Sequence, residues 1–412
     1  MPAATAPVSP FTIPDLELKS YCEDRDFRAE GRPEPNSRSQ ALIYHFEDKK
    51  WWIKVTFKGA VSSFPHDVEP EQVKSKRERR KEFQQFVTLI DFHSLALLDD
   101  TVTELILSED PKTTEPVNIH REPEDTNRFA KLINNLRFHI REDPLRVAYP
   151  PCIQFPSFRA INVAELIEED EITDGVFRVL HRGDRIPYIL KVVNRPLYQP
   201  RDTDVIRKEL ENLEHFRGVT GIVQPAGIAV FANPYATSQK WVQQMVVSGI
   251  LLEYYSGGSL QRVLNEQRVR EFGWERWAVQ IGNALGIIHR AKKTHMDLKP
   301  SNVVLDDNGN AVLIDISGIG GVTHGWRAPE IRDEISPFDL PFQTRRLNGI
   351  WAFGKLLMEI ASNAGDSPFV GTLKWVADHL TEENVHSRWT LSEGISQLKG
   401  DPTPEFDLVD LV

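Results

Sequence analysis

The sequence predicts an α+β protein, because a strand-rich region is followed by a helix-rich one. Both lie within residues 160–400, and residues 41–155 before them have mixed strand and helix character. Of the 412 residues, 40% are hydrophobic and 26% are charged, an ordinary globular composition with enough apolar material for a core. This composition excludes collagen-like, mucin-like and wholly disordered chains.

The first part of the chain contains three regions that differ in composition and hydrophobic pattern. Residues 1–40 are rich in proline, serine and charge, so we expect a poorly ordered segment there. The runs ALIYHF and WWIKVTF then predict two strands joined by a polar turn at 47–50. Residues 83–98 fit helix and strand equally, whereas 127–140 have the apolar spacing of an amphipathic helix. The sequence assigns no function to residues 41–155.

The second part changes from short strands to longer helices. Its strand-like segments are 175–182, 187–193, 228–231 and 244–254. Its helical patterns are 259–269, 274–291, 349–362 and 391–398. Residues 401–412 are expected to form a tail.

Charge and cysteine content restrict the partners and the compartment. The net charge is −11, from 60 acidic and 49 basic residues, so we expect no nucleic-acid partner. No apolar stretch approaches the ~18 residues of a membrane span, and the first residues lack the features of a secretory signal, so no membrane partner is expected. The two cysteines favour a reducing compartment, and we expect a cytoplasmic protein. The basic run 74–81 leaves nuclear import open, although a solvated helix start explains it more simply.

One segment, THMDLKPSNVVLDDNGNAVLIDISG, has the residue types that phosphoryl transfer needs. Asp297 is followed by Lys299 and then by Asn302. A strand–turn–strand pattern leads on to Asp315, and such a hairpin brings Asn302 and Asp315 towards each other. Two hard oxygen ligands suit Mg²⁺ carrying a nucleotide phosphate, and Asp297 beside them can accept a hydroxyl proton.

This segment resembles the catalytic loop and metal-binding segment of the protein kinase family. The family pattern is His-Arg-Asp-Leu-Lys-Pro-x-Asn, and residues 295–302 read His-Met-Asp-Leu-Lys-Pro-Ser-Asn. The resemblance implies a two-lobed protein-kinase-like domain over residues 160–400, with ATP and Mg²⁺ as cofactors. The catalytic residues that it implies are Asp297, Lys299 and Asn302, and the metal ligands are Asn302 and Asp315.

The resemblance also implies a nucleotide site. Lys191, which ends the strand YILK, is expected to hold the α- and β-phosphates and to pair with a helix glutamate. Glu209 has the family's spacing for that role, and Glu211 is the alternative. Leu252 is expected at the back of the adenine pocket. The remaining nucleotide contacts that the resemblance implies are the backbone of Glu253 and Tyr255, Ser259 near the ribose, and the side chains of Val179, Ile189 and Val304.

Further matches lie downstream. Residues 326–330 resemble the Ala-Pro-Glu that closes the family's activation segment, and Arg388 stands where an arginine pairs with that glutamate. Lys299 and Thr323 belong, in the family, to members that act on serine and threonine, although Thr323 is equally well explained as an ordinary loop threonine. The resemblance therefore implies phosphoryl transfer to serine or threonine hydroxyls of a protein substrate.

The sequence also departs from the family. The phosphate-binding loop retains only Gly175 of its three glycines, and Ile189 is bulkier than the usual alanine. Ser317 replaces the glycine of Asp-Phe-Gly, and Met296 replaces the arginine that receives an activation-loop phosphate. Two interpretations stay open: an active serine/threonine kinase, and a pseudokinase that serves as a binding or scaffold module. A small-molecule phosphotransferase is a third, which the Lys-Pro after Asp297 argues against.

Overall fold

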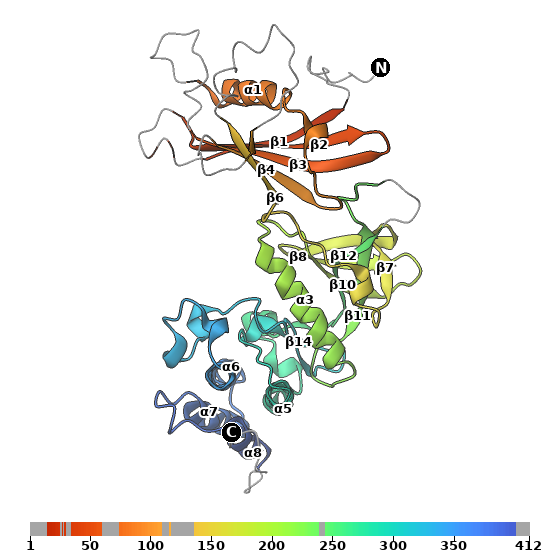
Figure 1. Cartoon of the computed structure of the whole chain (residues 1–412). Helices are drawn as coiled ribbons and strands as arrows, with labels where there is room; N and C mark the ends of the chain where they lie inside the picture. Colours follow the sequence, from red (N-terminus) through yellow and green to blue (C-terminus); the bar gives the residue numbers. More distant parts are fainter. Residues whose placement is uncertain are drawn as a thin grey trace. The chain divides into compact units, whose positions relative to one another are not determined.

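The chain folds into two compact units (Figure 1). A computed structural model describes residues 15–24, 27, 29, 34–59, 74–108, 115–116, 136–238 and 244–400. The first unit comprises residues 1–146 and 232–244, and the second comprises residues 147–231 and 245–412. The region that resembles a kinase therefore lies in the second unit, apart from the segment 232–244.

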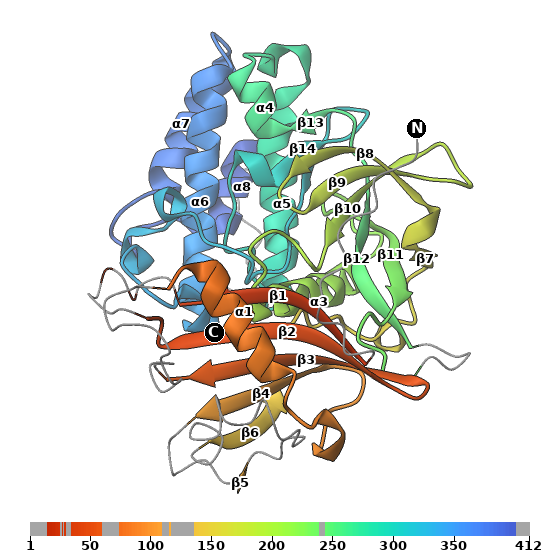
Figure 2. The same cartoon turned by 90° about the horizontal axis from the view of Figure 1, so that it is seen from above.

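The first unit is a six-stranded sheet with a helix, α1 (Lys76–Val87), across one face (Figure 2). The strand order is β1-β2-β3-β4-β6-β5, and only the β3–β4 pair is parallel. The strands are β1 (Leu16–Glu23), β2 (Ser37–Phe46), β3 (Lys49–Lys58), β4 (Val102–Ser108), β5 (Glu115–Pro116) and β6 (Arg137–Glu142). Phe83 and Phe86 of α1 are buried with Val55 and Leu105 of the sheet, which fixes α1 on this face.

The first unit differs in part from what the sequence predicts. The predicted pair of strands at 41–57 is confirmed as β2 and β3. The segment 1–40 contains β1 and the start of β2, contrary to the disorder expected there. The helix predicted at 127–140 is wrong for residues 137–140, which lie in β6; residues 127–135 lie outside the described part. Phe138 and Ile140 alternate with polar residues and pair with β4, so the strand period of two prevails there.

A segment between two strands of the second unit folds with the first unit. The backbone N–H of Asp100 donates to Thr237 Oγ1 at 2.8 Å, and Thr237 N–H donates to Asp100 Oδ1 at 3.0 Å. Trp52 Nε1 donates to the carbonyl of Pro234 at 3.0 Å, and its ring contacts Tyr235 edge-on. The sequence analysis divided the chain near residue 155 and did not predict this exchange.

The small lobe of the second unit is a sheet with strand order β7-β11-β12-β10-β9-β8 and one long helix (Figure 1). Its strands are β7 (Ala160–Asn162), β8 (Leu166–Thr173), β9 (Val176–His181), β10 (Pro187–Val192), β11 (Pro225–Ala232) and β12 (Met245–Glu253), and the helix is α3 (Pro200–His215). The sheet presents two faces because side chains alternate along each strand. One face buries a cluster that includes Val179, Leu190 and Leu251.

The large lobe is helical, which confirms the two-lobed α+β prediction. Its helices are α4 (Leu260–Asn265), α5 (Trp277–Arg290), α6 (Phe342–Asn363), α7 (Pro368–Leu380) and α8 (Leu391–Lys399). A three-stranded sheet is formed by β13 (Gly258–Ser259), β14 (Val303–Leu305) and β15 (Ala311–Leu313). Helix α6 begins seven residues before the predicted Gly349. Among the described residues, no helix is long and apolar enough to span a membrane.

Short 3₁₀ helices complete both units. They are Phe92–Ser94, Cys152–Gln154, Val163–Glu165, Val269–Glu271, Trp274–Arg276, Pro300–Asn302, His324–Trp326, Pro329–Ile331 and Pro337–Asp339. The basic run 74–81 forms the start of α1, where Arg79 is buried and bonds Glu23 at 2.7 Å. The run is therefore a helix start in which Arg79 is the buried member.

Candidate active site

The hairpin predicted after Asn302 is confirmed. Strands β14 and β15 pair with Val303 opposite Leu313, and Ile314 N–H donates to Asn302 O at 3.1 Å. The turn between them is held by Asp306, whose side chain accepts from the backbone of Asn310 at 2.8 Å. The hairpin therefore places Asn302 beside the residue that precedes Asp315.

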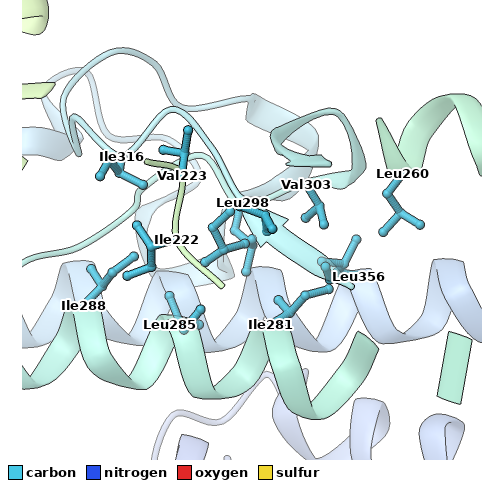
Figure 3. Close-up of a cluster of buried hydrophobic side chains, with 14 of the residues drawn as sticks. Ile222, Val223, Leu260, Ile281, Leu285, Ile288, Leu298, Val303, Ile316 and Leu356 are labelled. Carbon is cyan, nitrogen blue, oxygen red and sulfur yellow. The ribbon is translucent and has the colours of Figure 1, made fainter. Parts of the chain in front are cut away.

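Buried neighbours fix the catalytic segments to the large lobe. Leu298, Val303 and Ile316 follow Asp297, Asn302 and Asp315 directly in the sequence, and each is at most 2% exposed. Figure 3 shows the three side chains in one cluster with Ile281, Leu285 and Ile288 of α5. Each polar residue is thus followed in the sequence by a residue whose side chain is packed in the core. This packing limits the movement of the polar groups.

Asp297, Lys299 and Thr323 form one hydrogen-bonded group. Lys299 Nζ lies 2.8 Å from Asp297 Oδ2 and donates to Thr323 Oγ1 at 2.7 Å. The backbone N–H of Thr323 donates to Asp297 Oδ1 at 2.8 Å. Burial raises the pKa of Asp297, but the bonds from Lys299 and Thr323 outweigh burial and leave that pKa below its usual range. Asp297 is therefore a carboxylate at neutral pH, able to accept a hydrogen bond from a hydroxyl group.

Asn302 and Asp315 each keep an oxygen for a cation. Asn302 is 5% exposed, and its Nδ2 donates to Asp297 O at 2.7 Å and to Asp297 Oδ2 at 3.2 Å, which leaves Oδ1 as a ligand. Asp315 accepts from Lys191 through Oδ1 and retains Oδ2. Mg²⁺ commonly takes one or two protein oxygens and completes its shell with phosphate and water, so this pair fits it. The described residues contain no cluster of three or more His, Cys, Asp or Glu for a metal held by protein alone.

Lys191 joins the two lobes of the second unit. Its Nζ donates to Glu209 Oε1 of α3 at 2.6 Å and also to Asp315 Oδ1. Glu211 instead pairs with Lys208 on the exposed side of α3, so the structure selects Glu209 from the two predicted alternatives. Burial lowers the pKa of Lys191, but the carboxylates of Asp315 and Glu209 outweigh burial and raise that pKa. The side chain is therefore a charged ammonium group beside the candidate metal ligands.

A contact that the sequence analysis missed lies next to this pair. Asn212 of α3 is 2% exposed, and its Nδ2 donates to Ile316 O at 2.6 Å and to Ser317 O at 3.4 Å. Ser317 Oγ in turn accepts from Gly320 N–H at 3.0 Å. These bonds fold the residues after Asp315 tightly against α3. The available signal was an asparagine one helical turn after Glu209, on the face that carries Leu210 and Leu213.

Two further residues, Asn348 and Arg388, hold the end of the activation segment. Asn348 is 1% exposed, accepts from Ala328 N–H at 2.9 Å and donates to Met296 O at 3.4 Å. The sequence analysis did not assign it a role. Arg388 donates to Glu330 through two nitrogens, at 2.7 and 3.0 Å, as the resemblance implied. A bidentate pair of this kind is a fixed geometric link between the segment and the helical lobe.

The glycine that remains in the phosphate loop is already bonded. Gly175 has φ +74°, a conformation that favours glycine, and an added Cβ would lie 2.6 Å from Arg195 Cβ. Its N–H donates to Glu171 Oε1 at 3.3 Å, and its carbonyl accepts from Val192 N–H at 2.9 Å. The N–H is therefore directed to a carboxylate, whereas a phosphate-binding loop presents such groups to the ligand.

A cavity of about 260 Å³ lies beside this loop. Its lining brings together the predicted Lys191, Glu209, Asp297 and Asp315. Asp174, an acidic residue of the altered loop, also lines it. Negative charge on several sides favours a bound cation and disfavours a phosphate that lacks one.

The prediction that Val179 contacts the nucleotide is wrong. In the β9–β10 pair, Val179 lies opposite Tyr188, and it is buried at 1% exposure on the face away from Lys191. Arg178 lies opposite Ile189 and shares the face of Ile189 and Lys191, because side chains alternate along a strand. Moving the assignment along a strand by one residue exchanges the two faces of the sheet. The position above the base that was assigned to Val179 is therefore occupied by Arg178.

The remaining predicted nucleotide residues lie on β12, in the segment after it, and on the paired strands β10 and β14. Ile189 pairs with Leu252, which is 3% exposed, so these two predicted residues lie side by side. Glu253 N–H donates to Gln224 O at 3.0 Å, and Tyr255 O accepts from Gly258 N–H at 3.3 Å. Ser259 pairs with Val304, but its hydroxyl caps α4 by accepting from Arg262 N–H at 3.3 Å. Its side chain thus has a structural partner besides any ribose.

A comparison with protein families matches residues 173–386 to the protein kinase domain. The matched region is more than half of the 412 residues. The chain belongs to the protein kinase family. The match begins at the last residue of β8, so the first unit of this kinase lies outside it except for residues 232–244.

Curated relatives of this kinase carry serine/threonine-protein kinase names. Nek6 of Oryza sativa subsp. japonica is 26% identical over 205 residues, 46% of this chain and 34% of the relative. KIC1 of Saccharomyces cerevisiae is 24% identical over 226 residues, 51% of this chain and 19% of the relative. The probable LRR receptor-like kinase RPK1 of Arabidopsis thaliana is 28% identical over 134 residues, 28% of this chain and 23% of the relative. The alignments span about a third or less of these relatives.

Proposed function

We propose that this protein kinase transfers a phosphoryl group from Mg-ATP to serine or threonine hydroxyls of protein substrates. The observation that carries the proposal is the contact of Lys191 with both Glu209 and Asp315. Kinase catalysis requires the lysine–glutamate pair and the metal-binding aspartate to be in place together. The names of the relatives and the Lys299–Thr323 bond at 2.7 Å support transfer to serine and threonine.

Each residue has one task in this reaction. Lys191, oriented by Glu209, binds the α- and β-phosphates, while Asn302 and Asp315 would hold Mg²⁺. When bound, Mg²⁺ neutralises the charge that the phosphates carry. Asp297 accepts the hydrogen bond of the substrate hydroxyl, aligns it for attack and takes its proton as the new bond forms. Lys299 keeps the Asp297 carboxylate ionised and oriented through its 2.8 Å contact.

A pseudokinase is the second candidate, and the phosphate loop favours it. The Gly175 N–H is used by Glu171, and Arg178 lies where an apolar residue was expected. Both features reduce nucleotide affinity without touching the catalytic residues. In that case the domain is a binding or scaffold module with the fold of a kinase.

A nucleotide titration with and without Mg²⁺, followed by a phosphorylation assay, tests the proposal. Asp297→Asn should abolish transfer and leave Mg-ATP binding intact, because Asp297 acts on the hydroxyl. Asp315→Asn should weaken the Mg-dependent part of the binding. Asp366→Asn, an exposed aspartate between α6 and α7, is the matched control and should change neither. Absence of nucleotide binding by the unaltered protein at saturating Mg²⁺ would reject catalysis in favour of the pseudokinase.

A further inference from the structure

Arg178 is the one charged residue of β9 on the nucleotide face of the small-lobe sheet. It lies opposite Ile189, and Ile189 in turn lies opposite Leu252 on the other side of β10. These three positions form a row across the sheet next to Lys191, because directly opposed residues share a face. A nucleotide base bound between this row and the large lobe would have the Arg178 position above it.

Two carboxylates hold the Arg178 guanidinium. Its Nε lies 2.9 Å from Glu169 Oε2, and an Nη lies 3.2 Å from Asp170 Oδ1. The β8–β9 register shifts between Glu168 and Asp170, so Glu169 is an extra residue in β8. A bulge of this kind redirects a side chain, and here it brings a second carboxylate to Arg178.

The charged group extends towards the segment that follows β12. The guanidinium carbon of Arg178 lies 5.9 Å from the centre of the Tyr254 ring, which is next to Glu253 and Tyr255. The Arg178 side chain is 36% exposed, so water still reaches it. A base that entered here would remove that water from one guanidinium and two carboxylates.

We propose that Arg178, together with Glu169 and Asp170, forms a charged roof over the base position that lowers the affinity of this kinase for the purine base of its nucleotide. This inference rests on the proposed function, because it concerns the same nucleotide site. Ligand sites for flat aromatic groups are mostly apolar, and removing water from an ion pair costs more than its attraction returns. Most of the affinity for the nucleotide then comes from its metal-bound polyphosphate. Lys191, Asn302 and Asp315 bind this part at the end of the site away from Arg178.

The opposite effect has to be weighed. A guanidinium can stack on an aromatic ring and attract it, which would make Arg178 favourable for the base. Here two carboxylates already neutralise the guanidinium, which reduces that attraction. The desolvation cost applies to all three charged groups, so we expect it to prevail.

The test compares two ligands on Arg178→Val: Mg-ATP, and Mg-tripolyphosphate, which has no base. The variant should bind Mg-ATP about tenfold more tightly, because an apolar valine side chain then faces the base, while the carboxylates of Glu169 and Asp170, 31% and 53% exposed, stay in contact with water. Its affinity for Mg-tripolyphosphate should stay within about twofold of the unaltered protein. Arg185→Val, an exposed arginine in the β9–β10 turn, is the control for loss of one positive charge and should change neither. Arg178→Leu, checked by thermal melting, replaces the first variant if that protein does not fold.

Each outcome decides the inference. Unchanged or weaker Mg-ATP binding by the folded variant would overturn it, and the weaker case would assign Arg178 a stacking role. Equal tightening for both ligands would also overturn it, because the effect would then be one of net charge. If the unaltered protein binds no nucleotide but Arg178→Val does, the proposed catalytic function fails while the charged roof stands.

Discussion

Asn212 provides a stringent test of how the catalytic residues are kept together. The change Asn212→Ala removes the donor that lies 2.6 Å from Ile316 O and leaves that carbonyl without this bond. Loss of a partner from a buried polar group costs about 1–3 kcal/mol. The bond joins α3, which carries Glu209, to the residue after Asp315. Its loss should therefore destabilise the conformation in which Lys191 contacts both carboxylates.

The expected magnitude follows from that cost. A free energy of about 1–3 kcal/mol corresponds to a shift of about 5–150-fold in the equilibrium between docked and undocked forms of the segment. The Mg-dependent nucleotide affinity should decrease by a factor of about 5–150, and amide hydrogen exchange over 316–321 should accelerate by a similar factor. Nucleotide affinity is measured by titration calorimetry and exchange by mass spectrometry.

A control on the same helix separates this effect from general loss of stability. Lys208→Ala removes only an exposed pair with Glu211 at 2.8 Å, which contributes at most about 0.5 kcal/mol. It should leave affinity and exchange unchanged. If Asn212→Ala lowers the melting temperature while the Mg-dependent affinity and the exchange of 316–321 keep their original values, Asn212 is a packing residue and the reasoning is refuted.

Three other predictions concern regulation and stability. Phosphatase treatment should leave kinase activity unchanged, because Met296 cannot bind a phosphate; a large loss traced to phosphorylated Thr323 would contradict this. Burial lowers the pKa of His289 to about 3, against ~6.5 in an unfolded chain, so the unfolded state takes up the proton first and stability falls as the pH drops below about 6.5. His289→Gln should flatten that fall in melting temperature between about pH 6.5 and 4, and an unaltered slope would assign it to other groups. Arg388→Ala should lower the free energy of unfolding by about 3 kcal/mol in urea titrations, the lower end for a broken buried pair because Glu330 keeps 20% exposure; a loss below about 1 kcal/mol would show that the pair is dispensable.

The catalytic segment was predictable because its chemistry is local in the sequence. Asp297, Lys299 and Asn302 lie within six residues, and the turn Asp-Asp-Asn-Gly marks the hairpin that follows. Backbone rules are enough to place Asn302 beside the residue before Asp315. The choice of Glu209 over Glu211 was also accessible, since only Glu209 lies on the apolar side of α3.

The face of each β9 residue was not predictable in the same way. Val176, Phe177, Val179 and Leu180 place apolar side chains on both faces, so no alternation marks the core side. The pairing with β10 decides the face, and pairing is a long-range property that one strand does not encode. The docking of residues 232–244 on the first unit depends likewise on single bonds, such as that between Asp100 and Thr237, which leave no periodic signal.

The two ends of the proposed nucleotide site are supported by different parts of this kinase, so that one end can change without the other. Asn302 and Asp315 are fixed by the β14–β15 hairpin, the α5 core and the Asn212 bond. Gly175 and Arg178 belong to the β8–β9 hairpin, whose first strand is almost wholly exposed. Substitutions in an exposed hairpin cost little stability, whereas those in the buried core cost several kcal/mol. Core packing therefore keeps the backbone at the proposed metal ligands in place, while the exposed hairpin tolerates a charged residue such as Arg178, so measured nucleotide binding is stronger evidence for activity than intact catalytic residues.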